Sequence, residues 1–204
     1  MSDERTRIVG AGYDAMADTW AEWSAQITDE PRGIWLNKLL DLLPGGDVLE
    51  LGCGDGTRET GVLASRYRTT GVDLSVEQLR RARERVPDAT FVHADVTEVS
   101  FAAQSFDAVC AFYVLSHVPR ELLPALFARV RAWLRPGGYF LATLGASDVE
   151  NWHGEWLGVP MYFSGHVPDR NRELLADFAL FDDEVVTIAE PEGEVSFHWI
   201  LART

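Results

Sequence analysis

Short apolar runs alternate with longer amphipathic runs along most of this chain. Val48, Leu49 and Leu51 make one apolar run directly after a Pro-Gly-Gly turn, which is how a strand buried on both faces of a parallel sheet reads. Similar runs predict strands at 69–73, 91–94, 105–112 and 139–144, separated by predicted helices at 34–43, 57–66, 76–85 and 119–134. Because strand and helix alternate, the pattern predicts a parallel sheet with right-handed crossover connections.

The two ends of the chain depart from this alternation. Residues 1–10 are polar and predicted to fray, whereas residues 12–26 have the pattern of one amphipathic helix or two short ones. A final helix is predicted at 172–178, followed by a closing pair of strands at 184–189 and 195–202. The acidic residues near this pair are expected to form a solvated edge that discourages further strand pairing: Asp182, Asp183, Glu184, Glu190, Glu192 and Glu194.

Between the fifth strand and the last helix, residues 145–169 are rich in aromatic residues, glycine and proline. The pattern predicts a long loop, and long loops in compact domains are usually functional. Its aromatic side chains either line a binding site or merely pack on the sheet, and the sequence allows both.

Composition narrows the class of protein. With 204 residues and 47% apolar content, the chain is expected to form a single α/β domain over residues 1–204. A net charge of −14 argues against nucleic acid and anionic membrane as partners, because both reward basic patches. It does not exclude a cationic or neutral small molecule. Cys53 and Cys110 read as buried thiols of a reducing compartment, and without a signal peptide or a membrane-spanning run a cytoplasmic location is expected.

A glycine-rich turn follows the first strand, where Gly52, Gly54 and Gly56 occupy alternate positions. Glycine lets the backbone turn sharply and lets a ligand lie against bare main chain. About 20 residues further on, Asp73 ends the second strand, where a carboxylate accepts hydrogen bonds from ribose hydroxyls in nucleotide-binding units. A turn without a ligand, and an aspartate that only caps the next helix, are the alternatives. The two features together favour a nucleoside ligand.

The spacing of the glycines decides among nucleoside ligands. The dinucleotide fingerprint requires Gly or Ala at position 57, and a phosphate loop requires Lys after its last glycine; Thr57 and Arg58 stand there instead. The stretch DVLELGCGDGT at 47–57 resembles motif I of the class I S-adenosylmethionine-dependent methyltransferases, V-L-E/D-x-G-C-G-x-G. The resemblance implies S-adenosylmethionine as cofactor. It also implies a Rossmann-like seven-stranded, mostly parallel sheet with a reversed last strand and helices on both faces.

The resemblance also implies roles for particular residues. The N-terminal pattern Y-D-x-x-A-x-x-Y/W, matched by Tyr13 and Trp20, implies helices within residues 1–30 that lie over the cofactor as a lid. Asp95, with the N–H of the next residue, would bind the adenine edge, although it can equally cap a turn at Thr97. The cofactor-binding residues implied are Tyr13, Glu50, Gly52, Cys53, Gly54, Asp73, Leu74, Asp95, Val96, Ala111 and Phe112.

The acceptor of the methyl group is expected to lie against an insertion at 145–170, where these methyltransferases commonly place acceptor-binding elements. The residues expected to contact it are Trp20, Trp152, Trp156, Tyr162 and Phe163. The candidates for a general base are His117, His153 and His166, since an imidazole titrates near neutrality. Each of the three can instead be a structural or surface residue. No metal-ligand spacing is present, so a metal-independent transfer to oxygen or nitrogen is expected.

Rival functions remain open at this point. A regulatory module that binds S-adenosylmethionine without chemistry fits the same motifs, because the glycine turn and Asp73 report binding only. A nicotinamide oxidoreductase is disfavoured by Thr57 and by the lack of a Tyr-x-x-x-Lys pair, since Lys38 is the only lysine. A methyltransferase acting on a protein or on nucleic acid is the alternative to one acting on a small molecule.

Overall fold

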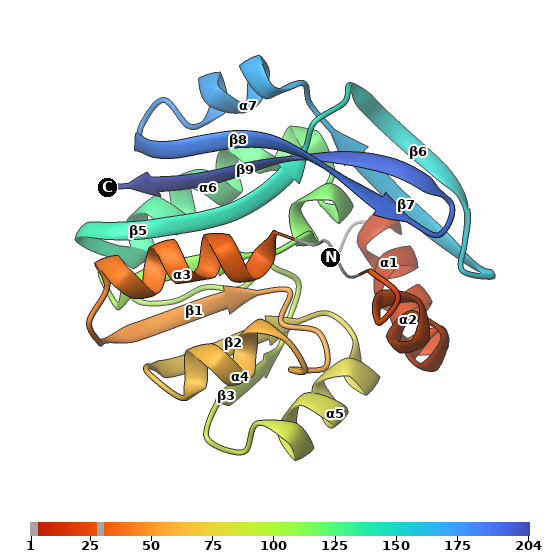
Figure 1. The fold of residues 1–204 in the computed structure, drawn as a ribbon, viewed down its shortest axis with the longest axis horizontal. Coiled ribbons are helices and arrows are strands. Elements are labelled where there is room, and N and C mark those ends of the chain that lie inside the picture. Colours follow the sequence, from red (N-terminus) through yellow and green to blue (C-terminus); the bar gives the residue numbers. More distant parts are fainter. Residues whose placement is uncertain (1–3, 28–30) are drawn as a thin grey trace.

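A seven-stranded sheet with helices on both faces forms the centre of the molecule (Figure 1). The computed structural model describes residues 4–27 and 31–204. In these ranges the strand order of the sheet is β3-β2-β1-β4-β5-β9-β8, and β6 and β7 form a separate two-stranded sheet. The five strands from β3 to β5 are parallel, whereas β9 is antiparallel to both of its neighbours. The predicted fold class, with its reversed last strand, is confirmed.

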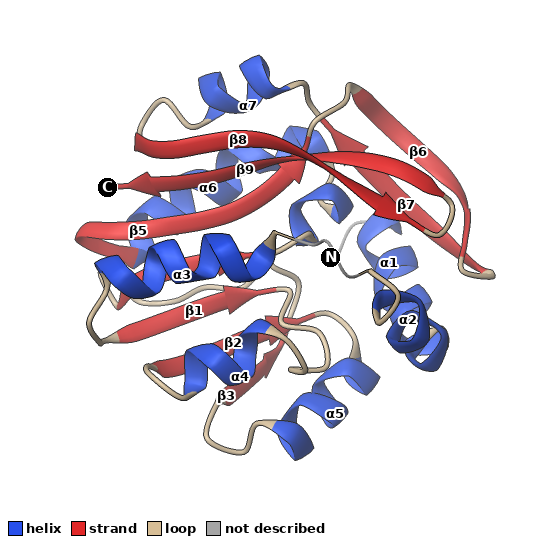
Figure 2. Ribbon diagram, viewed as in Figure 1, coloured by secondary structure: helices blue, strands red, loops and turns tan. Residues whose placement is uncertain are grey.

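Figure 2 separates the helices from the strands. The strands are β1 (Asp47–Leu51), β2 (Arg68–Asp73), β3 (Thr90–His93), β4 (Phe106–Ala111), β5 (Leu134–Gly145), β6 (Val149–Trp156), β7 (Val159–Gly165), β8 (Ala179–Glu190) and β9 (Gly193–Arg203). The α-helices are α1 (Glu4–Ala15), α2 (Ala17–Ser24), α3 (Arg32–Leu42), α4 (Glu59–Ala64), α5 (Val76–Arg85), α6 (Leu123–Trp133) and α7 (Pro168–Leu174). Two short 3₁₀ helices, η1 (Val114–His117) and η2 (Arg120–Leu122), lie between β4 and α6.

Two apolar clusters cover the two faces of the sheet. Successive side chains of a strand point to opposite faces, so Leu49 packs with α6 and α7 on one face while Val48 packs with α3 and α4 on the other. Both side chains are fully buried. The continuous apolar runs of the sequence therefore predicted central strands for the right physical reason. None of the helices in the described ranges is long and apolar enough to cross a membrane.

The N-terminal residues differ from the prediction. Residues 1–3 and 28–30 of the expected lid lie outside the described residues, but α1 begins at Glu4, within the segment predicted to fray. Tertiary packing explains the helix, because α1 lies closely against β7. A Cβ atom on Gly12 would lie 2.8 Å from Cε of Met161 and 3.0 Å from the carbonyl oxygen of Pro160.

The segment 145–169 is a β-hairpin, and the prediction of a loop was wrong. Trp152 pairs with Phe163 and His153 with Tyr162 across β6 and β7. Leu157 and Gly158 join the strands, with φ angles of 51° and 81°, the positive values that a two-residue type I′ hairpin requires. Leucine rarely adopts such a φ angle, so the turn carries no recognisable sequence signal. The last helix, α7, also begins earlier than predicted, at Pro168.

The β8–β9 hairpin projects beyond the rest of the sheet. The pairing of β5 with β9 ends at Gly145 and Phe197, whereas β8 and β9 continue to pair up to Glu190 and Gly193. The tip of this hairpin therefore stands past the carboxyl ends of the parallel strands, the edge at which open α/β sheets bind ligands.

Candidate active site

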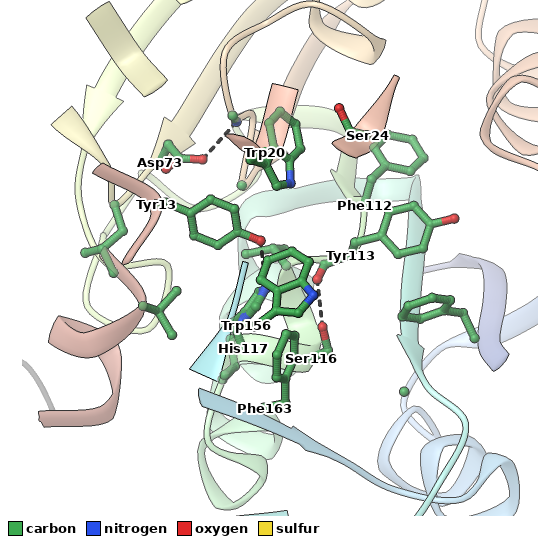
Figure 3. A pocket seen from close by; sticks show the side chains of 18 of the residues that line it. Tyr13, Trp20, Ser24, Asp73, Phe112, Tyr113, Ser116, His117, Trp156 and Phe163 are labelled. Atoms are coloured by element: carbon green, nitrogen blue, oxygen red, sulfur yellow. Dashed lines mark hydrogen bonds between the residues drawn. The ribbon is translucent and has the colours of Figure 1, made fainter. Parts of the chain in front are cut away.

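A cavity of about 520 Å³ lies at the carboxyl ends of the parallel strands. Its floor is the glycine turn after β1 together with the ends of β2 and β4. Helices α1 and α2, the 3₁₀ helix η1 and residues of both hairpins contribute further parts of its wall. Figure 3 shows Tyr13 and Trp20 facing Phe112, Tyr113 and His117 across this space. The volume is in the range of small-molecule sites.

The glycine turn presents bare backbone to the cavity. Gly52 and Gly54 have φ angles of +71° and +54°, a region that residues with a side chain rarely adopt. A Cβ atom on Gly52 would lie 2.5 Å from Cβ of Val114, so this position accepts only glycine. At Gly54 a Cβ atom would be in ordinary van der Waals contact with the Trp20 ring, at 3.9 Å, so Trp20 lies over the bare main chain at this position.

Asp73 is held in place by the turn it faces. Its Oδ2 accepts a hydrogen bond from Gly54 N at 2.8 Å and its Oδ1 accepts one from Ser75 N at 2.9 Å (Figure 3). Burial raises the pKa of the Asp73 carboxyl, and the backbone N–H donors oppose that shift. Each carboxylate oxygen can accept more than one hydrogen bond. The oriented carboxylate can therefore receive the hydroxyls of a ribose.

Asp95 combines the two alternatives that the sequence left open. Its Oδ1 accepts hydrogen bonds from the N–H and the hydroxyl of Thr97, both at 2.7 Å, so it caps the turn after β3. It also lines the cavity. The hydrogen bonds to Thr97 therefore orient the Asp95 carboxyl group while it still faces the cavity.

Glu50 lies directly below the glycine turn and is 1% exposed. Burial, followed by the charge of Glu59, raises its pKa well above the usual range. Its Oε2 has no hydrogen-bond partner among the described residues. A buried oxygen without a partner is costly, above all when it is charged, and the raised pKa favours the neutral form of this carboxyl group.

Tyr13 and His117 form a hydrogen-bonded pair inside the cavity. The Tyr13 hydroxyl lies 2.9 Å from Nε2 of His117, and Nδ1 of the same ring lies 3.0 Å from the carbonyl oxygen of Tyr162. A carbonyl oxygen only accepts, so Nδ1 carries the proton and donates it to Tyr162. The neutral ring then has its lone pair on Nε2, and Tyr13 donates to it.

Burial keeps both members of this pair uncharged. It lowers the pKa of His117 to about 4, against a small opposing effect of the hydrogen bond to Tyr162. Burial also raises the pKa of Tyr13, and the charge of Asp73 adds to that effect. At neutral pH the pair is thus an uncharged donor and acceptor with a defined direction.

Helices α1 and α2 are tied to the walls of the cavity by polar contacts. Asp14 Oδ1 accepts hydrogen bonds from Ser75 Oγ at 2.6 Å and Glu77 N at 3.0 Å, at the start of α5. On the opposite side, the indole N–H of Trp23 donates to Glu192 Oε2 at 2.8 Å, at the tip of the β8–β9 hairpin. The two helices therefore span the cavity from α5 to the β8–β9 hairpin.

The structure brings most of the predicted site residues to this cavity. Those that line it are Tyr13, Trp20, Gly52, Cys53, Gly54, Asp73, Leu74, Asp95, Val96, Phe112, His117, Trp156 and Phe163. Six others do not line it, for reasons of strand geometry. Glu50 and Ala111 point into the two layers that cover the sheet, and Tyr162 is buried beside His153. Trp152 and His153 are exposed neighbours on β6, and His166 follows the end of β7. These six are Glu50, Ala111, Trp152, His153, Tyr162 and His166. Tyr162 still contributes its carbonyl oxygen to His117.

Several cavity residues were not predicted. Tyr113 has a left-handed backbone, with φ 61°, and its ring packs edge-on against Phe197 at 4.6 Å between centroids. Trp23 and Arg32 also line the cavity, the latter with its guanidinium 4.8 Å from the centre of the Tyr113 ring. Of these three, only Trp23 could have been predicted from the sequence, because it belongs to the aromatic pattern of the helix expected at 12–26.

The expected solvated edge of six acidic residues was partly wrong. Glu190 and Glu192 line the cavity because the β8–β9 hairpin carries them past the end of the sheet. Asp182 instead pairs with Lys38, and Asp183 accepts a hydrogen bond from the buried His198. In the described part of the chain, no group of three or more His, Cys, Asp or Glu side chains is placed to hold a metal ion.

Comparison with known proteins finds methyltransferases. Residues 48–138 match the family described as methyltransferase domain. A 27-O-demethylrifamycin SV methyltransferase of Amycolatopsis mediterranei is 32% identical over 154 residues, which are 64% of this chain and 55% of that protein. The sterol methyltransferase-like 1 protein of Botryococcus braunii is 29% identical over 195 residues, 82% of this chain and 49% of that protein. The chain thus spans about half the length of these relatives.

A solved structure shares the fold across nearly the whole chain. It is the 1,6-didemethyltoxoflavin-N1-methyltransferase of Burkholderia thailandensis, bound to 1,6-didemethyltoxoflavin and S-adenosylhomocysteine. The TM-score is 0.69 at 23% identity, over 98% of this chain and 86% of that one. At this level of identity the likeness concerns the arrangement of the strands and helices.

Proposed function

Because residues 48–138 match the family described as methyltransferase domain, we propose that the chain is a class I S-adenosylmethionine-dependent methyltransferase and that it transfers a methyl group from S-adenosylmethionine to a small-molecule acceptor. One observation carries the proposal. The bare backbone of Gly54, the carboxylate of Asp73 and the Tyr13–His117 pair all face one cavity. Binding groups for a nucleoside therefore lie beside groups that can handle a proton.

The residues of the cavity suit the cofactor. Asp73 would accept the ribose hydroxyls, and Asp95 with the N–H of Val96 would bind the adenine edge. Gly54 presents its backbone to the cavity, where the chain that links ribose and methionine would lie. Phe112 and Trp20 lie on the other side of this space, and aromatic faces attract a cation such as a sulfonium.

When bound, S-adenosylmethionine supplies an electrophilic methyl group, and the electron pair of the broken S–C bond stays on sulfur. The protein's own contribution is alignment, which can supply on the order of 7 kcal/mol or more of the barrier. The proton of the acceptor would pass to the Tyr13 oxygen while Tyr13 gives its proton to Nε2 of His117. His117 thus ends as an imidazolium. Its lowered pKa favours rapid return of that proton once the product leaves.

A cavity of about 520 Å³ favours a small acceptor over a protein or a nucleic acid. Four aromatic residues line the cavity outside the groups assigned to the cofactor: Trp156, Phe163, Tyr113 and Phe197. An aromatic wall suits a planar or apolar acceptor. Oxygen and nitrogen acceptors both fit the Tyr13–His117 pair, because either loses a proton on methylation. A cytoplasmic location belongs to the same proposal and is supported by the two buried free cysteines, Cys53 and Cys110.

A regulatory module that only binds the cofactor is the second candidate, since the glycine turn and Asp73 serve binding alone. The Tyr13–His117 pair favours the enzyme, because binding does not need a proton acceptor. The two are separated by incubating the protein with methyl-labelled S-adenosylmethionine and a metabolite extract. Labelled product that depends on Tyr13 supports the enzyme. Tight cofactor binding without product from any extract supports the module.

A further inference from the structure

Carboxylates dominate the charged groups of the cavity. Among the described residues that line it, six are acidic and two are basic: Asp55, Glu59, Asp73, Asp95, Glu190 and Glu192 against Arg32 and Arg58. The excess of negative charge at the site matches the net charge of −14 for the whole chain. A cavity of this sign attracts cations and repels anions.

Most of these groups already have partners. Glu59 forms an ion pair with Arg32 at 3.1 Å, Asp55 pairs with Arg85, and Arg58 donates to the carbonyl oxygen of Ser24. The two arginines are thus engaged with protein groups and are not directed at an incoming anion.

Glu190 is the exception among the acids. It stands at the end of β8, half-buried, where the hairpin extends beyond the sheet. Its side-chain carboxylate has no hydrogen bond or ion pair among the described residues. Burial raises its pKa to about 7, and the neighbouring charge of Glu192 adds to the shift. A half-buried carboxylate without a partner is costly, so a cationic ligand would relieve the cost.

Aromatic rings border the same part of the cavity. Trp23 and Trp156 meet edge-to-face with ring centroids 5.2 Å apart, and Tyr113 meets Phe197 in the same way. These four belong to the apolar cluster that includes Ile188, two residues before Glu190 on the hairpin. Aromatic faces next to a carboxylate are the groups that bind ammonium ions in proteins.

We infer that the acceptor carries a basic nitrogen, cationic at neutral pH, which Glu190 and the surrounding aromatic rings hold while an apolar body fills the cavity. This inference rests on the proposed function, because it names the class of molecule that receives the methyl group. Glu190 acts here as a binding residue. Its place on the projecting hairpin, across the cavity from the glycine turn, keeps it apart from the groups assigned to the cofactor.

Three phenylalkyl probes of similar size test the inference on protein saturated with S-adenosylhomocysteine. Phenethylamine is cationic, phenethyl alcohol is neutral and 3-phenylpropionate is anionic. Calorimetry should give the amine an affinity about tenfold higher than the alcohol, as expected for a partly desolvated carboxylate and aromatic contacts, and the anion should bind most weakly. Equal binding of the three, absence of binding by all, or preference for the anion would overturn the inference.

Glu190→Gln keeps the shape of the side chain and removes its charge. The variant should reduce the preference for the amine to about twofold or less while the affinity for S-adenosylhomocysteine stays unchanged. Glu194→Gln is the matched control, since Glu194 is exposed on the same hairpin and does not line the cavity. An undiminished preference in folded Glu190→Gln contradicts the assignment.

A second measurement uses the wild-type protein alone. Phenyltrimethylammonium does not titrate, so its affinity should rise between pH 6 and pH 8 as Glu190 ionises. The charged or titratable groups that interact with this region are Glu192 on the hairpin, Tyr13 on α1 and Arg32 on α3. A pH-independent affinity counts against Glu190.

The outcomes also separate this inference from the proposed function. Methyl transfer to a neutral or anionic acceptor would leave the enzyme standing and overturn the cationic acceptor. Selective binding of the amine by a protein that does not bind S-adenosylmethionine would support a cation site at Glu190 and overturn the proposed methyltransferase.

Discussion

The hydroxyl of Tyr13 lies 2.9 Å from Nε2 of His117, and this contact joins the first helix of the chain to the turn that follows β4. The same ring donates from Nδ1 to the Tyr162 carbonyl on β7. One imidazole thus connects the N-terminal helix, the end of the central sheet and the β6–β7 hairpin. The contact that holds α1 at the cavity therefore also orients the Tyr13 hydroxyl.

Removing the Tyr13 hydroxyl should slow methyl transfer without weakening cofactor binding. A positioned proton-transfer group contributes roughly 100-fold or more, so Tyr13→Phe is expected to lower kcat by about that factor. His117→Gln should have a similar effect. His153→Gln serves as control, because His153 is exposed on β6 and should leave kcat unchanged. Normal turnover in folded Tyr13→Phe would show that the pair has no part in the chemistry.

His117 should make the fold sensitive to acid. Its pKa is about 4 in the folded protein, against 6.5 as the ordinary value, so the unfolded chain binds the proton more readily. Stability from this residue is complete above pH 6.5 and declines as the pH falls toward 4. A shift of this size corresponds to roughly 3 kcal/mol. Urea titrations at pH 7 and pH 4.5 should show a smaller loss of unfolding free energy in His117→Gln than in wild type. An equal loss in both contradicts a lowered pKa of the buried His117 imidazole.

The central sheet was predictable because its strands are buried on both faces. Val109 stands in an uninterrupted apolar run at 108–112, and Leu49 in a short apolar run broken only by Glu50. The glycine turn was also predictable, because a φ angle of +71° next to Val114 tolerates only glycine at position 52. Local constraints of this kind leave a mark on the sequence.

The acceptor side was harder to predict because distant contacts build it. Leu157 adopts a positive φ angle only because the two strands it joins are paired elsewhere. Glu190 lies in an acidic stretch that looks solvated. Its place at the cavity depends on how far β8 extends past β5, which no local pattern records. The three histidine candidates could likewise be told apart only in the structure, where His117 lines the cavity and His153 and His166 do not.

Two tryptophans on one strand offer a matched test of the acceptor wall. Trp156 lines the cavity and packs 6.3 Å from Tyr13 between ring centroids, whereas Trp152 is 40% exposed and lies outside it. Trp156→Leu should weaken binding of phenethyl alcohol to the S-adenosylhomocysteine complex by about tenfold, since a large aromatic surface is lost. Trp152→Leu should leave that affinity unchanged. Equal effects of the two substitutions would mean that the hairpin is scaffold only.

Asp14 should control how firmly the N-terminal helices close. It caps the start of α5 through Ser75 and Glu77, and loss of such a cap costs about 1 kcal/mol. Asp14→Ala is expected to speed hydrogen exchange in α1 and α2 and to weaken S-adenosylmethionine binding by about fivefold. In the wild type, exchange across residues 12–26 should slow when the ligand binds. If the exchange rate across residues 12–26 is the same with and without the ligand, these helices only pack on the core and do not close over the cofactor.

The central claim is that the cavity over the glycine turn binds S-adenosylmethionine through Asp73. Calorimetric titration of S-adenosylmethionine and of NAD into wild type and Asp73→Asn tests it most directly, with Asp88→Asn as an exposed control. Wild type and control should bind S-adenosylmethionine and not NAD. Asp73→Asn should lose about 1.5–3 kcal/mol of binding free energy, as for a hydrogen bond to a charged group. Preference for NAD, or unchanged affinity in folded Asp73→Asn, would contradict the account.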